Sequence, residues 1–165
     1  MSSCNGLLAR QHGGIRAIMS QEKFWKVKPL KAMTESEWES LCDRCGKCCL
    51  IQLEDDDGRL EFTDVACHLF NCTTGQCRDY ANRSVRVPDC VTLTPDNISN
   101  LHFMPKTCAY RLISEGRDLP DWHPLVSGDP NSTARASMSV RGLVVSESDL
   151  GDDEIDTRIR AWPGE

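Results

Sequence analysis

The chain has 165 residues, of which 25 are acidic, 19 are basic and ten are cysteine; its formal net charge is −6 and 39% of its residues are hydrophobic. The negative charge argues against nucleic-acid binding, because affinity for phosphates depends mostly on Lys and Arg. No apolar run is long enough to span a bilayer, and residues 1–20 lack an apolar stretch of signal-peptide length, so we expect a soluble, cytoplasmic protein without a membrane partner.

The pattern along the chain predicts three parts. Residues 1–20 show no hydrophobic periodicity and are predicted to be a disordered N-terminal extension. Residues 21–148 contain nine of the ten cysteines and are predicted to form a metal-binding domain. Residues 149–165 are acidic, and because Ile155 and Ile159 lie at helical spacing we expect a C-terminal helix or tail.

Local signals predict the first elements of the domain. Thr34 and Glu37 have the spacing of a capping box, which predicts a short helix leading into the first cysteines. Asp57 and Gly58 lie between apolar flanks, and this predicts a hairpin or loop turn within residues 52–63.

Further signals follow in the second half. Thr94 and Pro95 predict the start of a helix, and a second helix is predicted to follow Pro105 and to end at Gly116. Residues 139–146 are rich enough in β-branched side chains for one strand. Together these elements predict an α+β fold of mostly short helices with a small hairpin or sheet, irregular and held together by metal.

Four cysteines lie within eight residues: Cys42, Cys45, Cys48 and Cys49. Two overlapping C-x2-C units place three thiolates around one tight loop, which suits a tetrahedral zinc site or three corners of an iron–sulfur cluster. Gly46 can adopt a positive φ there and turn its amide toward a sulfur. In a reducing compartment clustered cysteines usually indicate metal. A redox-active disulfide motif is the alternative, but no βαβ pattern precedes the loop.

Five further cysteines lie at wider spacing: Cys67, Cys72, Cys77, Cys90 and Cys108. Together with the first four they are enough for two four-ligand sites with one thiol left over. We expect the first site to combine one later cysteine with Cys42, Cys45 and Cys48. The second site would draw on Cys67, Cys77, Cys90 and Cys108, and Cys49 would join it or pack in the core. The three nearby histidines are interpreted as exposed or core residues and not as ligands: His68, His102 and His123.

The chain resembles the YkgJ-type cysteine-cluster proteins, and especially their YcgN-like branch. The matching stretches span residues 24–147 and are Phe24-Trp25-Lys26, Glu37-Trp38-Glu39, Leu41-Cys42-Asp43, Cys45-Gly46-Lys47-Cys48-Cys49, Val65-Ala66-Cys67, Cys77-Arg78-Asp79-Tyr80, Val87-Pro88-Asp89-Cys90, Leu93-Thr94-Pro95, Thr107-Cys108-Ala109-Tyr110-Arg111-Leu112, Trp122-His123-Pro124-Leu125 and Ser139-Val140-Arg141. The branch has a C-x-C pair ending at the position of Cys77. This chain has Gly75 there and Cys72 three residues earlier, so Cys72 is either a substitute ligand or a spare thiol.

The resemblance implies a cysteine domain that chelates zinc or iron, without an assigned reaction. The leading hypothesis is therefore a metal-binding protein that holds iron, as an iron–sulfur cluster, or zinc. More distantly, the chain is similar to flagellin lysine N-methylases, which keeps open a redox or methyl-transfer-related enzyme that uses an iron–sulfur cluster. In such an enzyme Trp122 and His123 would line a pocket, although a buried anchor is the favoured interpretation. The third hypothesis is a zinc-stapled protein-interaction module, whose protein partner the sequence does not identify.

Overall fold

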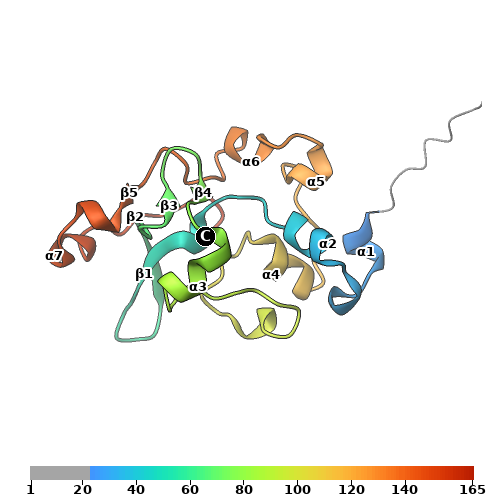
Figure 1. Ribbon diagram of the computed structural model, residues 1–165, viewed down its shortest axis with the longest axis horizontal. Helices are drawn as coiled ribbons and strands as arrows, with labels where there is room; N and C mark the ends of the chain where they lie inside the picture. The colour runs from blue at the N-terminus through green and yellow to red at the C-terminus, as the bar shows by residue number, and fades with distance from the viewer. Residues whose placement is uncertain (1–22) are drawn as a thin grey trace, which may run out of the picture.

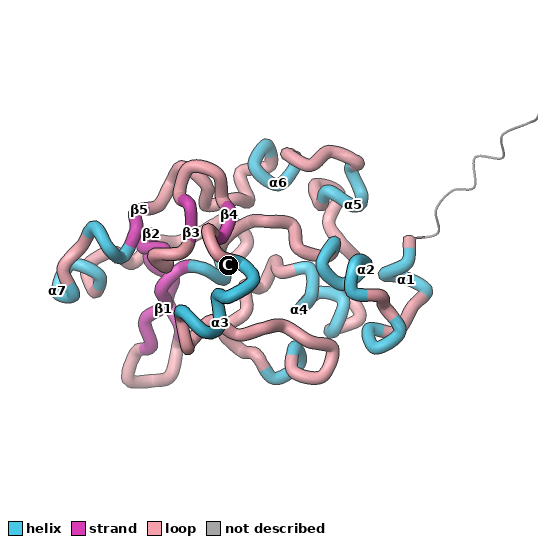
Figure 2. The backbone as a smooth tube through the Cα atoms, in the orientation of Figure 1, coloured by secondary structure: helices cyan, strands magenta, loops and turns pink. Residues whose placement is uncertain are grey.

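The structure is a computed structural model that describes residues 23–165 (Figure 1). The predictions for residues 1–20, and the position of Cys4, lie outside the described residues. Within the described part no helix is longer than six residues and the longest strand has seven. Short helices and small sheets joined by loops confirm the predicted α+β class (Figure 2).

Short helices, 3-10 turns and short strands follow one another along the described chain. The helices are α1 (Phe24–Val27), α2 (Glu35–Ser40), α3 (Arg83–Arg86), α4 (Ala109–Ser114), α5 (Pro124–Ser127), α6 (Ser132–Arg135) and α7 (Asp152–Ile155). The 3-10 turns are η1 (Leu30–Ala32), η2 (Lys47–Cys49), η3 (Tyr80–Asn82), η4 (Ile98–Asn100) and η5 (Glu147–Asp149). The strands are β1 (Leu50–Glu54), β2 (Leu60–Ala66), β3 (Phe70–Asn71), β4 (Gln76–Cys77) and β5 (Val145–Ser146).

The predicted hairpin is formed by β1 and β2, which pair antiparallel. Its turn is closed by Asp55, whose carboxylate accepts from the amides of Asp57 and Arg59, and by Gly58, whose φ of 77° is in the left-handed region. β5 adds to the other side of β2 in parallel, which gives the sheet order β1-β2-β5. β3 and β4 form a separate two-stranded sheet. All five strands lie on the same side of the molecule (Figure 2).

The strand predicted over residues 139–146 is shorter than expected, because only Val145–Ser146 is paired. A turn interrupts it: the Leu143 amide donates to the Val140 carbonyl, and Gly142 has a φ of 77°. Val140 nevertheless is completely buried, and its amide donates to the Cys45 carbonyl at 2.8 Å. Val140 thus packs in the core and bonds to the cysteine loop, and it does not pair in a sheet.

Two of the three helix signals before Gly116 are confirmed. Thr34 and Glu37 form both bonds of the capping box at the start of α2. α4 lies within the range predicted after Pro105, and Gly116 follows it with a φ of 73°. The signal at Thr94 gives only a turn and the three residues of η4, because the Asn97 side chain bonds the Thr94 amide and the Thr92 carbonyl.

The C-terminal segment differs from the predicted helix. α7 ends at Ile155, and residues 158–162 run beside β2, where the Arg160 amide donates to the Phe62 carbonyl. Arg158 forms a two-pronged ion pair with Asp64, at 2.7 and 3.0 Å. Trp162 is buried and its indole donates to the Thr63 carbonyl. Backbone pairing to β2 therefore overrides the helical spacing of the apolar side chains.

The core has two clusters, and the cysteine loop connects them. The larger one lies among the helices and includes Trp25, Trp38, Leu41, Met104 and Tyr110. The smaller one lies at the sheets and comprises Leu50, Ala66, Phe70, Val140 and Trp162. Because Leu41 belongs to the first and Leu50 to the second, residues 42–49 pass from one cluster to the other.

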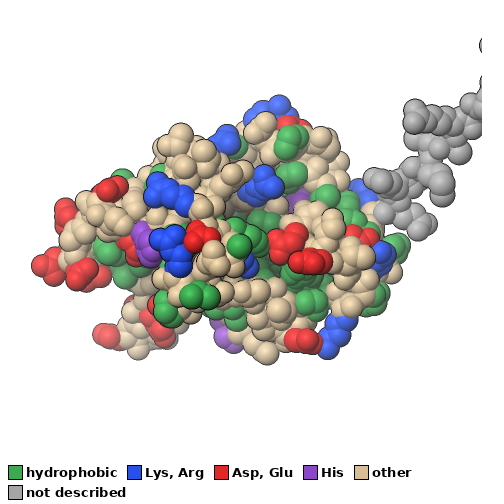
Figure 3. All heavy atoms as spheres, viewed as in Figure 1, with side chains coloured by type: hydrophobic (Ala, Val, Ile, Leu, Met, Phe, Trp, Pro, Cys, Tyr) green, Lys and Arg blue, Asp and Glu red, His purple; other side chains and the backbone are tan. Residues whose placement is uncertain are grey.

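The visible face carries mixed charges, and acidic side chains gather over α7 at one end (Figure 3). In the described part of the chain, no helix has both the length and the apolar character needed to cross a membrane.

Candidate metal centre

The loop of residues 42–49 turns tightly because two of its residues have positive φ. Arg44 has a φ of 57° and Gly46 of 81°. A Cβ atom at Gly46 would lie 2.7 Å from the Phe70 ring and 2.8 Å from a Val140 methyl group, so only glycine fits. The left-handed conformation expected of Gly46 is thus present, and close packing is a second reason for glycine at this position.

Two buried side chains bond to the backbone at the start of the cysteine loop. His123 is completely buried, and its Nε2 lies 3.0 Å from the Leu41 carbonyl while its Nδ1 accepts from the Leu125 amide. The ring is therefore neutral with its proton on Nε2, and burial lowers its pKa. Thr133 donates its hydroxyl to the Asp43 carbonyl. His123 thus is a buried anchor of the cysteine loop, as the sequence favours.

Lys47 connects the second half of the cysteine loop to distant parts of the chain. Its side chain is fully buried, and its ammonium donates to the Thr107 hydroxyl, the Pro163 carbonyl and the Glu165 carboxylate. The bond to Thr107 brings the start of α4, and with it Cys108, next to the loop. The role of Lys47 is not predictable from the sequence, since a lysine between cysteines gives no sign that it will be buried.

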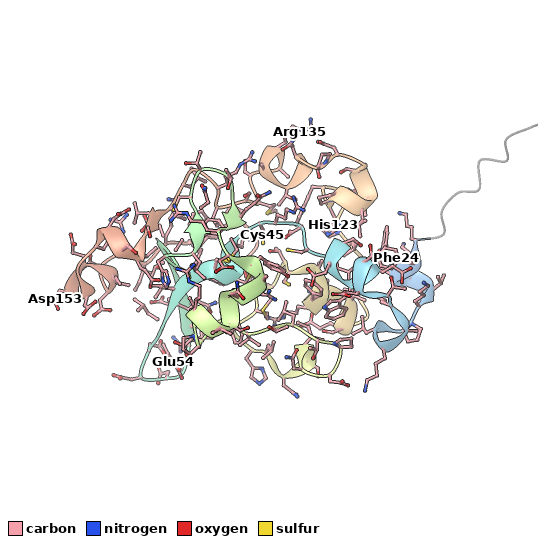
Figure 4. All side chains as sticks on the ribbon, viewed as in Figure 1. Phe24, Cys45, Glu54, His123, Arg135 and Asp153 are labelled. Carbon is pink, nitrogen blue, oxygen red and sulfur yellow. The ribbon has the colours of Figure 1, made fainter. Side chains whose placement is uncertain are left out.

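The charges of the loop cysteines and of Cys108 affect one another's pKa. Burial, and after it the charge of Cys48, raise the pKa of Cys42 to about 12. The same two causes raise the pKa of Cys108 to about 12. For Cys45, burial and the charges of Asp43 and Cys48 raise the pKa well above its ordinary value. We refer to Cys42, Cys45, Cys48 and Cys108 as the loop group; Cys45 is labelled in Figure 4.

The loop group is partly open to solvent. Cys42 and Cys48 are exposed, whereas Cys45 and Cys108 are buried. Burial nevertheless contributes to the raised pKa of both thiols, so protein atoms surround the two sulfurs although the residues are exposed. Contact with the Cys49 thiol is the largest cause of the raised pKa of Cys48, so these neighbours lie close together.

The pKa values of two later cysteines, Cys67 and Cys90, are also raised. Burial raises the pKa of Cys67, with smaller contributions from the charges of Glu147, Cys90 and Cys77. Burial also raises the pKa of Cys90, and there the charges of Cys48 and Cys77 contribute. The sequence leaves the fourth ligand of the first site open among the later cysteines, and Cys108 directly follows Thr107, whose hydroxyl accepts from Lys47 of the loop. The second site of Cys67, Cys77, Cys90 and Cys108 stays a prediction.

Asp43 is an unusual residue in the loop. It is buried, its Oδ1 accepts from the Cys45 amide at 3.0 Å, and its Oδ2 has no hydrogen-bond partner. Its charge raises the pKa of Cys42, Cys45 and Cys48. A buried anion among thiols is costly without a cation nearby, so the donor set of this loop fits a metal centre.

The predicted ligands are not gathered at the spacing of a single ion. Among the residues that the structure describes, only one group of three potential ligands has its donor atoms all within 4.8 Å of one another, namely Cys67, His68 and Glu147. Glu147 is absent from the ligands predicted from the sequence, and His68 is interpreted there as a non-ligand. Glu147 lies beside Cys67 because two strands pair, and the sequence alone does not reveal that pairing.

Two remaining candidates have other surroundings. Cys72 packs against the sheet cluster and its carbonyl accepts from the Gly142 amide. This supports a spare thiol more than a ligand. Gly75 has a φ of 74°, and its amide closes the turn between β3 and β4 on the Asn71 carbonyl.

One cavity is lined by no cysteine, although Thr107, the neighbour of Cys108, borders it. Its volume is about 430 Å³ and its lining includes Arg111, Arg117 and Trp122. His123, the adjacent residue in the enzyme hypothesis, is buried and bonded to the Leu41 carbonyl instead of facing this space.

Comparison with known proteins supports metal binding. Residues 41–109 match the family described as "Putative zinc- or iron-chelating domain". The chain is 54% identical to a "UPF0260 protein" of Parvibaculum lavamentivorans over 87% of this chain and 95% of the relative. It is 57% identical to one of Rhizorhabdus wittichii, over 83% and 94%, and 51% identical to one of Rhodopseudomonas palustris, over 90% and 88%. No solved structure matches the chain.

Proposed function

Since the chain belongs to the UPF0260 family, we propose that it is a metal-centre protein in which the loop group supplies four thiolate ligands: Cys42, Cys45, Cys48 and Cys108. An iron–sulfur cluster is the first candidate for the centre, and a zinc ion is the second. The observation that carries the proposal is the contact of Lys47 with Thr107, because it brings a fourth cysteine to the loop of three.

The width of the group favours a cluster over a single ion. Four thiolates on one zinc ion, each at about 2.3 Å, would lie about 3.8 Å apart. In the described part of the chain no three cysteine sulfurs lie within 4.8 Å of one another. A cubane accommodates wider spacing because four irons, and not one ion, lie among the thiolates.

The electrostatics of the loop group also support a metal. Every thiol of the group has a raised pKa, so without metal the group holds its protons at neutral pH. A bound cation favours the thiolate form and offsets the repulsion among the thiolates and Asp43. A metal at this place would therefore allow the four thiols to ionise beside the Asp43 carboxylate.

The test is anaerobic purification followed by iron, zinc and acid-labile sulfide analysis, together with the visible spectrum. We expect iron and sulfide, and broad visible absorption that zinc does not give. Cys42→Ser and Cys108→Ser should each remove most of this metal, because a serine hydroxyl binds soft metals poorly. Cys72→Ser is the matched control and should keep it. Full metal content in both Cys42→Ser and Cys108→Ser would overturn the proposal.

A further inference from the structure

Parallel pairing of β2 and β5 brings two potential ligands together. Val65 pairs with Val145 and Ala66 with Ser146. The carboxyl ends of parallel strands meet at the same edge of a sheet, so the residues that follow, Cys67 and Glu147, emerge side by side. These two residues are 80 positions apart in the sequence.

His68 completes the group. The Glu147 Oε1 atom accepts from the His68 amide at 2.7 Å and also lies 2.7 Å from His68 Nδ1. Cys67 Sγ, a ring nitrogen of His68 and a carboxylate oxygen of Glu147 all lie within 4.8 Å of one another. All three residues are half-buried, so the donors are reachable from solvent and yet held in place.

The surrounding backbone fixes the donors. The Cys67 amide donates to the Cys49 carbonyl and the Cys67 carbonyl accepts from the Phe70 amide. The Arg78 guanidinium donates to the His68 carbonyl. In the described part of the chain, the Glu147 carboxylate has no ion-pair partner other than His68, so no arginine or lysine supplies the cation for this site.

We propose that Cys67, His68 and Glu147 form a second metal site, which binds one divalent transition ion such as Zn²⁺ or Fe²⁺. A thiolate, an imidazole and a carboxylate are the ligand types of mononuclear zinc sites, and three protein ligands leave a fourth position open to solvent. The negative charges of the Cys67 thiolate and the Glu147 carboxylate would balance the two positive charges of the ion. The ion would take the place of the proton between His68 and Glu147, whose two donor atoms, now 2.7 Å apart, would have to separate to about 3.4 Å, the spacing of two tetrahedral ligands at about 2.1 Å from one ion.

This site is independent of the four-cysteine centre proposed above. It uses one sulfur, whereas the loop group uses four, and none of its ligands belongs to that group. The mixed donor set also predicts a different metal preference, because imidazole and carboxylate suit single zinc or iron ions while clusters are held mainly by thiolates.

The experiment uses the full chain with cobalt(II) as probe, after the native metal content has been measured. Wild type should bind one more ion than His68→Gln, Glu147→Gln or Cys67→Ser, or bind it more than ~100-fold more tightly. X-ray absorption at the cobalt edge should show one sulfur and two or three nitrogen or oxygen neighbours. His102→Gln and Glu61→Gln are matched controls, since both residues are exposed and outside the group, and they should bind as wild type does.

Iron and sulfide in the loop group are measured in the same samples. Glu147→Gln should leave them unchanged, because the amide oxygen still accepts from the His68 backbone and the fold is kept. Wild-type cobalt stoichiometry and affinity in both His68→Gln and Glu147→Gln would overturn the second site. Loss of iron and sulfide in Cys42→Ser, with cobalt binding unchanged, would be consistent with the second site. An equal loss of cobalt binding in His102→Gln and Glu61→Gln would refute it.

Discussion

The ammonium of Lys47 lies 2.9 Å from the carboxylate of Glu165 across 118 positions of the chain, and both side chains are buried. The same carboxylate accepts from the Thr107 hydroxyl and from the Lys106 amide. One charged pair therefore joins the cysteine loop, the start of α4 and the C-terminal segment. Removing one partner of such a pair is costly, because the other charge stays buried without compensation.

Glu165→Ala should therefore lower the free energy of unfolding by about 3–5 kcal/mol. Replacing both residues, as in Lys47→Met with Glu165→Ala, should cost less than Glu165→Ala alone, because no charge is left uncompensated. Lys31→Met is the control, since its pair with Asp96 is largely exposed and should contribute at most about 1 kcal/mol. Urea unfolding of the metal-loaded protein measures all three. Equal losses for Glu165→Ala and Lys31→Met would show that the buried pair adds nothing.

Gly46→Ala should disrupt the loop. The new methyl group would meet Phe70 and Val140 at less than 3 Å, and the φ of 81° disfavours any side chain. We expect a loss of about 2–4 kcal/mol in the free energy of unfolding, together with reduced metal content. At Gly116 the φ is 73° but nothing lies within 4 Å of the added carbon, so Gly116→Ala should cost only about 1 kcal/mol and keep the metal. Similar losses at both positions would place the cost in the backbone conformation and not in the packing.

Asp43→Asn should make the thiols more acidic. The carboxylate charge contributes to the raised pKa of Cys42 and Cys45, so its removal lowers both values and increases the thiolate fraction at a given pH. The amide oxygen can still accept from the Cys45 backbone. In metal-free protein kept folded with a stabilising osmolyte such as sucrose, alkylation of Cys42 by iodoacetamide at pH 8 should be faster in the variant, as mass spectrometry would show. Asp121→Asn, at an exposed position, should leave the rate unchanged, and an unchanged rate in Asp43→Asn would mean that the carboxyl carries no charge there.

Metal affinity should rise with pH. The pKa values of Cys42 and Cys108 are raised to about 12, so both thiols are protonated at pH 7 and must release a proton on binding. Each released proton adds about one power of ten in affinity per pH unit below the pKa. Competition with a metal-binding dye from pH 6.5 to 8.5 measures this slope. Cys108→Ser should reduce it by about one proton and Cys72→Ser should not. A flat profile would show that the ligands are already ionised.

The locally determined features of the fold can be predicted from the sequence. The capping box at Thr34 and the turn at Gly58 depend on side chains within a few positions, and both are found in the structure. Where a long-range contact competes, local signals fail. Trp162 leaves the helical pattern because its indole and the neighbouring backbone bond to β2.

The cysteine loop itself can also be predicted, because four thiols in eight residues are rarely incidental. The fourth ligand proposed above, Cys108, could not be singled out from the sequence, since the contact of buried Lys47 with Thr107 joins residues 60 positions apart. The proximity of Glu147 to Cys67 could not be predicted for a similar reason. This proximity is set by a parallel strand pair of two residues, which is too short to leave a pattern in the sequence.

Metal should be required for the folded state. A structural zinc ion contributes roughly 10–16 kcal/mol to folding in finger peptides, which matches the whole stability of a typical domain at about 5–15 kcal/mol. Here the apolar core is divided into two modest clusters joined by the cysteine loop, and that loop contains a buried carboxylate oxygen of Asp43 without a hydrogen-bond partner. Chelator-treated protein should therefore lose its near-UV circular dichroism and its cooperative thermal transition, and added metal should restore both. Cys42→Ser should behave like the chelated protein, whereas Cys72→Ser should melt as wild type to within about 1 kcal/mol. A stripped sample with an unchanged melting temperature would show that the two clusters suffice without metal.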